Sequence, residues 1–188
     1  MIQSVNFILA GTGGQGILFM TRILSHCAMR KGLRVIGAET HGMAQRGGSV
    51  VSHLKLGDAQ SSLIRTGTAH VLIALEENEA YRNIPFLRAG ARIYANMSKN
   101  PFPRPEVERF LSGRDIKARG IRAGHIAMAL GAPMCLNLTL LGFFSTFEKE
   151  PLSYQELKEA VSRESPSRFA EINLKAFEAG YSAGSGQG

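Results

Sequence analysis

The stretch that decides the fold is VNFILAGTGGQGILFMTRILSHCAMRKGLRVIGA, residues 5–38. Residues 5–10 are apolar and end at a glycine-rich turn, and residues 17–31 then repeat apolar side chains at helical spacing. Gly32 is typical of a helix C-terminus, and residues 33–38 are again apolar. A strand, a loop, a helix and a second strand in this order predict an α/β sheet that begins like a Rossmann fold.

The same alternation continues along the chain. Further strands are expected at 49–56, 70–75, 91–96 and 116–121, and further helices at 77–88, 106–111, 124–130 and 134–147. Ser153 and Glu156 form a capping box that opens another helix, and Ser165 with Pro166 is expected to open the last one. We expect one domain over residues 1–183, Rossmann-like, with a mostly parallel sheet flanked by helices and a helical C-terminal part. Residues 184–188 are expected to form a flexible tail.

Composition restricts the class of protein. The chain has 188 residues, 44% hydrophobic and 20% charged, which is typical of one globular domain with a buried core. The formal net charge of +7 favours an acidic or phosphorylated partner. Because the basic residues are scattered and form no basic tract, we do not expect nucleic acid to be that partner.

The two cysteines, Cys27 and Cys135, lie far apart in the sequence. An iron–sulfur cluster needs about four thiolates, and zinc sites need closely spaced ligands, so no metal site is expected in this chain. So few cysteines fit a reducing, cytoplasmic location. The start of the chain lacks the basic region of a signal peptide.

Residues 123–147 carry no formal charge when His125 is neutral. The run is near the roughly 20 residues that a membrane-spanning helix needs. Gly131 and Pro133 divide it, however, so two buried helices are the better interpretation and no membrane is expected.

The first candidate site is the G-x-G-x-x-G motif between the first strand and the first helix. Glycines allow a tight turn, and the helix N-terminus offers free N–H groups that suit a phosphate. The alternative is a glycine turn kept for chain geometry or for a protein contact. The candidate binding residues are Gly11, Gly13, Gly14, Gln15 and Gly16, together with Glu39 in the place of a ribose-binding acid.

The second candidate site is the polar loop ETHGMAQRGGS, residues 39–49. Arg46 could clamp a carboxylate or a phosphate, or it could pair with Glu39 inside the loop. We expect a ligand site or an interface here, because loops at the carboxyl ends of strands bind ligands in α/β sheets. Its candidate binding residues are Glu39, His41, Gln45, Arg46, Gly47, Gly48 and Ser49.

No catalytic residue is predicted. The sequence has no G-x-S-x-G elbow, and Ile17 follows Gly16 where a Walker motif would need lysine. The competing functional class is a stand-alone dinucleotide-binding Rossmann protein, which would use the glycine motif and Glu39.

Two stretches, GTGGQG at 11–16 and HGMAQRGGSVVSH at 41–53, resemble the gamma, or beta, subunit of 2-oxoacid:ferredoxin oxidoreductases. The likeness is greatest to the beta subunit of the indolepyruvate branch. Further matches are LIALE at 72–76, NLTLLG at 137–142 and INLKAFEAGY at 172–181, whereas residues 98–132 match only loosely.

The resemblance implies a subunit of an oxidoreductase that is not catalytic alone. In that family thiamine diphosphate with magnesium decarboxylates a 2-oxoacid, iron–sulfur clusters pass electrons to ferredoxin, and coenzyme A takes the acyl group. Those cofactors would lie in a partner chain, with ferredoxin as an indirect partner and coenzyme A as a shared substrate. A homodimer of the isolated chain stays open, as does the identity of the 2-oxoacid. The partner surface is expected on helix 134–147 or on loop 39–49.

Overall fold

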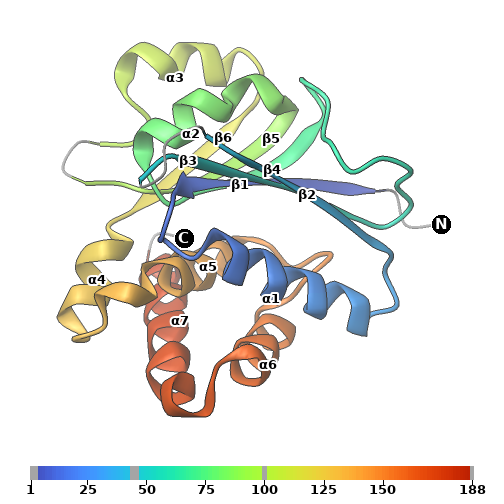
Figure 1. The fold of residues 1–188 in the computed structure, drawn as a ribbon. Coiled ribbons are helices and arrows are strands. Elements are labelled where there is room, and N and C mark those ends of the chain that lie inside the picture. Colours follow the sequence, from blue (N-terminus) through green and yellow to red (C-terminus); the bar gives the residue numbers. More distant parts are fainter. Residues whose placement is uncertain (1–3, 43–46, 99–100, 187–188) are drawn as a thin grey trace.

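A computed structural model describes residues 4–42, 47–98 and 101–186, and within them the side chain of His41 is left aside. Figure 1 shows a central sheet between two layers of helices, with α2 and α3 on one face and α1 and α4 to α7 on the other. The elements are β1 (Val5–Thr12), α1 (Ile17–Arg30), β2 (Val35–His41), β3 (Ser49–Leu56), β4 (Ala69–Ala74), α2 (Glu77–Asn83), a 3-10 turn (Ile84–Phe86), β5 (Leu87–Asn96), α3 (Pro105–Ser112), β6 (Lys117–Ile121), α4 (Ala123–Ala129), a 3-10 turn (Pro133–Cys135), α5 (Leu136–Phe147), α6 (Tyr154–Glu164), a 3-10 turn (Ser167–Phe169) and α7 (Ala170–Ser185).

The sheet has the order β2-β3-β1-β4-β5-β6. β1, β4, β5 and β6 pair in parallel, whereas β3 is antiparallel to both of its neighbours. The expected α/β fold with a mostly parallel sheet is therefore confirmed. One detail differs from a Rossmann start, because β3 folds back from β2 and inserts between β2 and β1. The two strands joined by α1 thus point the same way without being neighbours.

The central strands are buried on both faces, which explains their continuous apolar runs. In β1, Phe7 and Leu9 pack on the side of α1 and α5, whereas Ile8 and Ala10 pack on the side of α2. β4 is almost wholly buried in the same way, as its sequence predicted.

Helix α5 is apolar nearly all round because it lies between the sheet and α7. Phe144 contacts the rings of Phe7 and Tyr94, with ring centroids 6.1 and 5.2 Å away. Of the two interpretations of this helix, a buried core or a subunit interface, the core is correct. The backbones of α5 and α7 approach so closely that a Cβ atom on Gly142 would lie 1.9 Å from the carbonyl oxygen of Phe177.

The helix expected at 77–88 was wrong in its second half. Helix α2 ends at Asn83, and Pro85 stands at the start of a 3-10 turn. Proline removes a backbone donor, and the chain enters β5 at Leu87, which is fully buried. Strand β2 was expected to end at Ala38 but continues to His41, because it forms a ladder with β3.

The capping box at Ser153 and Glu156 is confirmed. The predicted start of the last helix was wrong, since α7 begins at Ala170. The Ser165 hydroxyl instead donates to the carbonyl of Val161 and accepts from Asn173. Helix α7 also runs through Ser185, into the stretch expected to be a tail.

No helix in the described part of the chain is long and apolar enough to span a membrane. Within residues 123–147, α4 and α5 are separate helices divided by the turn at Pro133–Cys135, as predicted.

The crossing of α5 and α7 predicts a large cost for a single methyl group. Gly142→Ala should lower the free energy of unfolding by about 3 kcal/mol or more, since the atom it meets is backbone and cannot move aside. Urea denaturation measures this. Gly186→Ala, where the nearest atom is 3.9 Å away, is the control and should stay within about 0.5 kcal/mol of wild type. Equal stability of the two variants would contradict the close packing.

His70 at the start of β4 predicts a pH-dependent stability. Burial, aided by Arg88 and Arg92, lowers the pKa of His70 from 6.5 to about 4. Its Nδ1 accepts the N–H of Asn6 at 3.0 Å, so the folded protein favours the neutral ring. The stabilisation is complete above pH 6.5 and is lost as the pH falls towards 4.

Urea denaturation at pH 8 and at pH 5 gives the free energy of unfolding at each pH. The decrease from pH 8 to pH 5 should be smaller in His70→Asn than in wild type, because asparagine keeps an acceptor that does not titrate. The same loss in both proteins would show that His70 does not carry this dependence.

Candidate functional site

The glycine-rich loop joins β1 to α1 at the edge of the sheet. Gly11 and Thr12 still belong to β1, and Gly16 stands just before Ile17 as the N-cap of α1. Gly14 and Gly16 have φ angles of 93° and 82°, in the left-handed region that favours glycine. The motif therefore forms the predicted strand–turn–helix.

At two positions of the loop, glycine is required because neighbouring side chains leave no room for a Cβ atom. A Cβ on Gly11 would lie 2.8 Å from the Gln15 side-chain oxygen, and one on Gly16 would lie 2.4 Å from the amide nitrogen of Asn137. Gly14 differs, because a Cβ there would meet nothing within 4 Å. Close packing thus accounts for Gly11 and Gly16, whereas the left-handed φ accounts for Gly14, which is exposed.

The side chain of Gln15 braces the loop from inside. Its Oε1 accepts the N–H of Thr12 at 2.8 Å, and its Nε2 donates to Oε1 of Glu76 at 2.5 Å. Glu76 follows β4, the parallel neighbour of β1. Glu76 was not among the predicted site residues, although it ends the matching stretch LIALE at 72–76.

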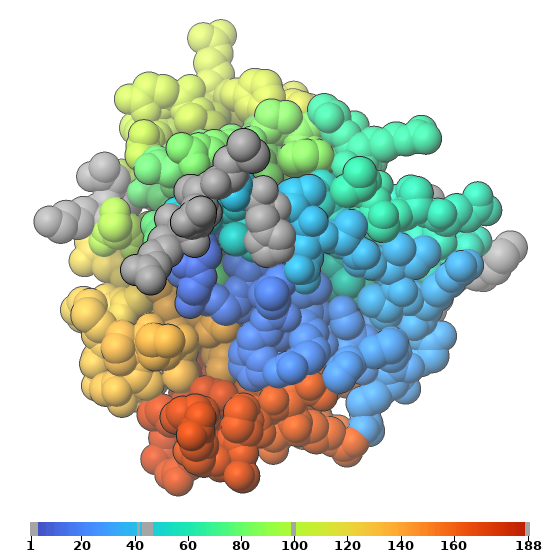
Figure 2. Space-filling model, viewed as in Figure 1, coloured from blue at the N-terminus to red at the C-terminus, as the bar shows by residue number. Residues whose placement is uncertain are grey.

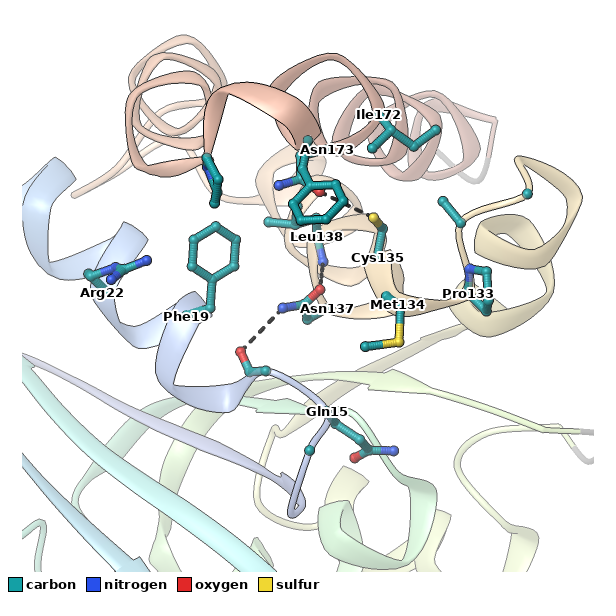
Figure 3. A pocket seen from close by; sticks show the side chains of 16 residues that line it. Gln15, Phe19, Arg22, Pro133, Met134, Cys135, Asn137, Leu138, Ile172 and Asn173 are labelled. Atoms are coloured by element: carbon teal, nitrogen blue, oxygen red, sulfur yellow. Dashed lines mark hydrogen bonds between the residues drawn. The ribbon is translucent and has the colours of Figure 1, made fainter.

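Asn137 braces the other side of the loop. It is buried in the first turn of α5, and its Nδ2 donates to the carbonyl of Gly16 at 3.2 Å. Figure 3 shows this bond beside the cavity described below. Asn137 was not among the predicted site residues, although it begins the matching stretch NLTLLG at 137–142.

The two predicted site segments meet in part. The N–H of Gly13 donates to the carbonyl of Gly48 at 2.9 Å, so the second loop lies against the first. Ser49 donates from its hydroxyl to the buried carboxylate of Glu79 at 2.7 Å, and Gly47 has a φ of 67°. Gln45 and Arg46 lie outside the described residues.

Glu39 is not beside the glycine loop. In β2 it pairs with Ser52 of β3, and Ser52 pairs with Leu9 of β1. Two strand spacings of about 4.8 Å place Glu39 roughly 10 Å from β1. A ribose-binding acid belongs on the strand next to β1, and the inserted β3 takes that place. His41 ends the same strand.

An apolar cavity of about 530 Å³ opens beside the loop, between α1, the turn at Pro133–Cys135, the start of α5 and α7 (Figure 3). Its walls include Phe19, Leu138 and Ile172. Met134 and Phe169 line it while 82% and 45% exposed. Gln15 lies at the edge of the hollow (Figure 3), and its amide bonds to Thr12 and Glu76.

A second hollow of about 400 Å³ shares Gly14, Gly16 and Phe19 with the first and adds Leu18 and Val50. The residues around Gly14 are therefore mostly apolar, and Arg22, Asn137 and Asn173 are polar residues that line the first hollow. The surfaces of α1, α4 and the C-terminal helices adjoin on the face shown in Figure 2. The expected partner surface on helix 134–147 is thus limited to Met134, because α5 itself is mostly buried.

Neither thiol is suited to redox or metal chemistry. Burial, with nearby Glu156, raises the pKa of Cys27 to about 12. Cys135 is buried too, its Sγ donates to Oδ1 of Asn173 at 3.2 Å, and burial raises its pKa. No group of three His, Cys, Asp or Glu that could hold a metal occurs in the described residues. Two separated thiols do not fit an iron–sulfur cluster.

The chain is thus a Rossmann-like α/β domain whose glycine loop is held by internal hydrogen bonds and lies beside a mostly apolar hollow. The chain belongs to the pyruvate ferredoxin/flavodoxin oxidoreductase family, whose model matches residues 6–183. The resemblance seen in its two loops is thereby confirmed.

A curated relative agrees with this assignment, and solved structures share the fold. The chain is 36% identical to indolepyruvate oxidoreductase subunit IorB of Archaeoglobus fulgidus, over 94% of each chain. The keto/oxoacid ferredoxin oxidoreductase gamma subunit of Geobacter sulfurreducens has the same fold, with a TM-score of 0.75 and 19% identity over 97% of this chain and 99% of that one. The fold also matches 2-oxoglutarate:ferredoxin oxidoreductase of Magnetococcus marinus, with a TM-score of 0.79 and 20% identity over 99% of this chain and 32% of the other.

The position of Glu39 predicts that the purified chain does not bind NAD. Calorimetric titration with NAD up to about 1 mM should give no saturable binding heat. A dissociation constant of about 1 mM corresponds to a binding free energy of only about 4 kcal/mol. The physical reason is that β3 stands between the glycine loop and Glu39. Saturable binding that is lost in Glu39→Gln would restore the dinucleotide hypothesis.

Proposed function

We propose that this chain is the small subunit of a thiamine diphosphate-dependent 2-oxoacid:ferredoxin oxidoreductase that acts on indolepyruvate or a related aryl pyruvate. With partner subunits it would support oxidative decarboxylation to an acyl-coenzyme A. The observation that carries the proposal is the match to an indolepyruvate oxidoreductase subunit over 94% of both chains. A stand-alone dinucleotide-binding protein is not favoured, because Glu39 lies two strands from β1.

The proposal assigns the cofactors to the partner chain and a supporting role to this chain. When bound in the partner chain, thiamine diphosphate with magnesium would supply decarboxylation, and iron–sulfur clusters would carry electrons to ferredoxin. This chain has two buried thiols and no predicted catalytic residue, so it would contribute shape and backbone. A cytoplasmic location fits free cysteines.

The partner is proposed to dock on the apolar surface around the glycine loop. Leu18, Met134 and Phe169 are between 45% and 82% exposed there, and each lines one of the two hollows. Exposed apolar groups that converge on one concave surface are typical of a protein interface. The net charge of +7 suits an acidic partner.

Coenzyme A is the proposed shared ligand. Gly14 is exposed, and no atom of the described residues lies within 4 Å of the place of a Cβ there. The chain's positive charge suits the phosphates of an acyl acceptor. The matched Magnetococcus marinus protein is described with coenzyme A and succinyl-CoA bound. The 2-oxoacid would be selected mainly by the partner chain, so other aryl pyruvates and branched oxoacids remain alternatives.

Purification of the tagged chain from its host should recover a thiamine- and cluster-binding chain, identified by mass spectrometry. The complex should reduce ferredoxin with an oxoacid and coenzyme A. Met134→Asp should weaken assembly about tenfold or more, since it places a charge in an apolar contact. Met29→Asp is the matched control and should leave assembly unchanged, because Met29 is 50% exposed but lines neither hollow.

Two results would contradict the proposal. One is turnover of an oxoacid by the isolated chain, and the other is equal assembly of both methionine variants.

A further inference from the structure

We propose that Gln15 and Glu76 form a positioning pair that fixes the open backbone of Gly14 for the acyl acceptor. This inference rests on the proposed function, in which coenzyme A lies across the glycine loop. It assigns Gln15 a different role from the one predicted from sequence, where it counted among ligand-binding residues. Glu76 has a role that the motif did not suggest.

The chemistry of the pair requires an amide at position 15. Its oxygen accepts from Thr12 at 2.8 Å, while its nitrogen donates to Glu76 at 2.5 Å. A carboxylate offers only acceptors, and methionine offers neither a strong donor nor a strong acceptor. Both ends of the Gln15 amide therefore bond within the protein, which favours a positioning role over a role as a ligand group.

The pair lies at the switch point of the sheet. Helix α1 leaves β1 on one face and α2 leaves β4 on the other, so the two loops diverge (Figure 1). The backbone connection between these strands reaches Leu75, whose N–H donates to Ala10 at 2.8 Å. Beyond it, the bond from Gln15 to Glu76 continues the connection between the loops. Crevices at such points are where α/β sheets place their ligands.

Gly13 and Gly14 are the exposed residues of the loop, and of the two Gly13 is tied to the second loop. Gly13 is held by Gly48, and Gly16 is held by Asn137. Asn137 is buried, so its replacement would disturb the core, whereas Gln15 and Glu76 are only partly buried. The pair can therefore be altered while the fold is kept.

A positioning role predicts a specific kinetic signature. The loop would lose its fixed geometry for the acyl acceptor, but the oxidising groups in the partner chain would be untouched. In the reconstituted complex, Gln15→Glu places two carboxylates in contact and should raise the KM for coenzyme A about tenfold, with kcat within about twofold of wild type. Gln15→Met removes both hydrogen bonds without adding charge and should shift KM in the same direction.

Exchange of the two chemical groups is the decisive test. The double variant Gln15→Glu with Glu76→Gln again provides one donor and enough acceptors, so KM should return to within about threefold of wild type. Lys158→Met is the matched control. It breaks the 2.6 Å ion pair with Glu178 between α6 and α7, at residues that line neither hollow beside the loop, and it should leave KM unchanged.

The outcomes separate the two proposals. If the wild-type complex makes no acyl-coenzyme A, the proposed function fails. If it does, an unchanged KM in Gln15→Glu and Gln15→Met overturns the positioning pair. A joint loss of kcat and KM that the double variant does not rescue overturns it as well, because that pattern is structural damage.

Discussion

The backbone crossing of α5 and α7 is the constraint on which the rest of the site depends. Gly142 and Gly180 let the helices touch at main-chain distance, since a Cβ on either would lie under 2 Å from the opposite carbonyl oxygen. This contact holds α5 between α7 and the sheet, where Phe143 and Phe144 are part of the core. It also brings the first turn of α5 to the glycine loop, so that Asn137 can hold Gly16. The first turn of α5 and the first turn of α7 therefore both line the cavity beside the loop.

The antiparallel strand β3 explains why a Rossmann-like start does not make a dinucleotide site. It occupies the place next to β1 and moves Glu39 one strand further out. The same insertion brings the end of the second loop to Gly13, through the carbonyl of Gly48. One change of topology therefore removes the ribose contact and joins two separate sequence motifs into one surface.

Local signals predicted the local features. The α/β alternation, the buried strand β4 and the capping box at Ser153 depend on neighbours in the sequence, and the structure agrees. The insertion of β3 and the start of α7 depend on contacts between distant segments, which spacing does not encode. The glycine motif likewise showed where the chain turns but not that Gln15 fills the turn, because Glu76 lies 61 residues away.

What this chain can offer a partner follows from what surrounds Gly14. Among the described residues, both thiols are buried with raised pKa values, and Gln15 bonds to Glu76 beside the loop. The exposed features described there are the loop backbone, Arg22 and mostly apolar side chains. In the proposed assembly those side chains exclude water from the shared site. Water competes with a thiol for a reactive acyl group, so a dry surface with a fixed loop favours transfer to coenzyme A over hydrolysis.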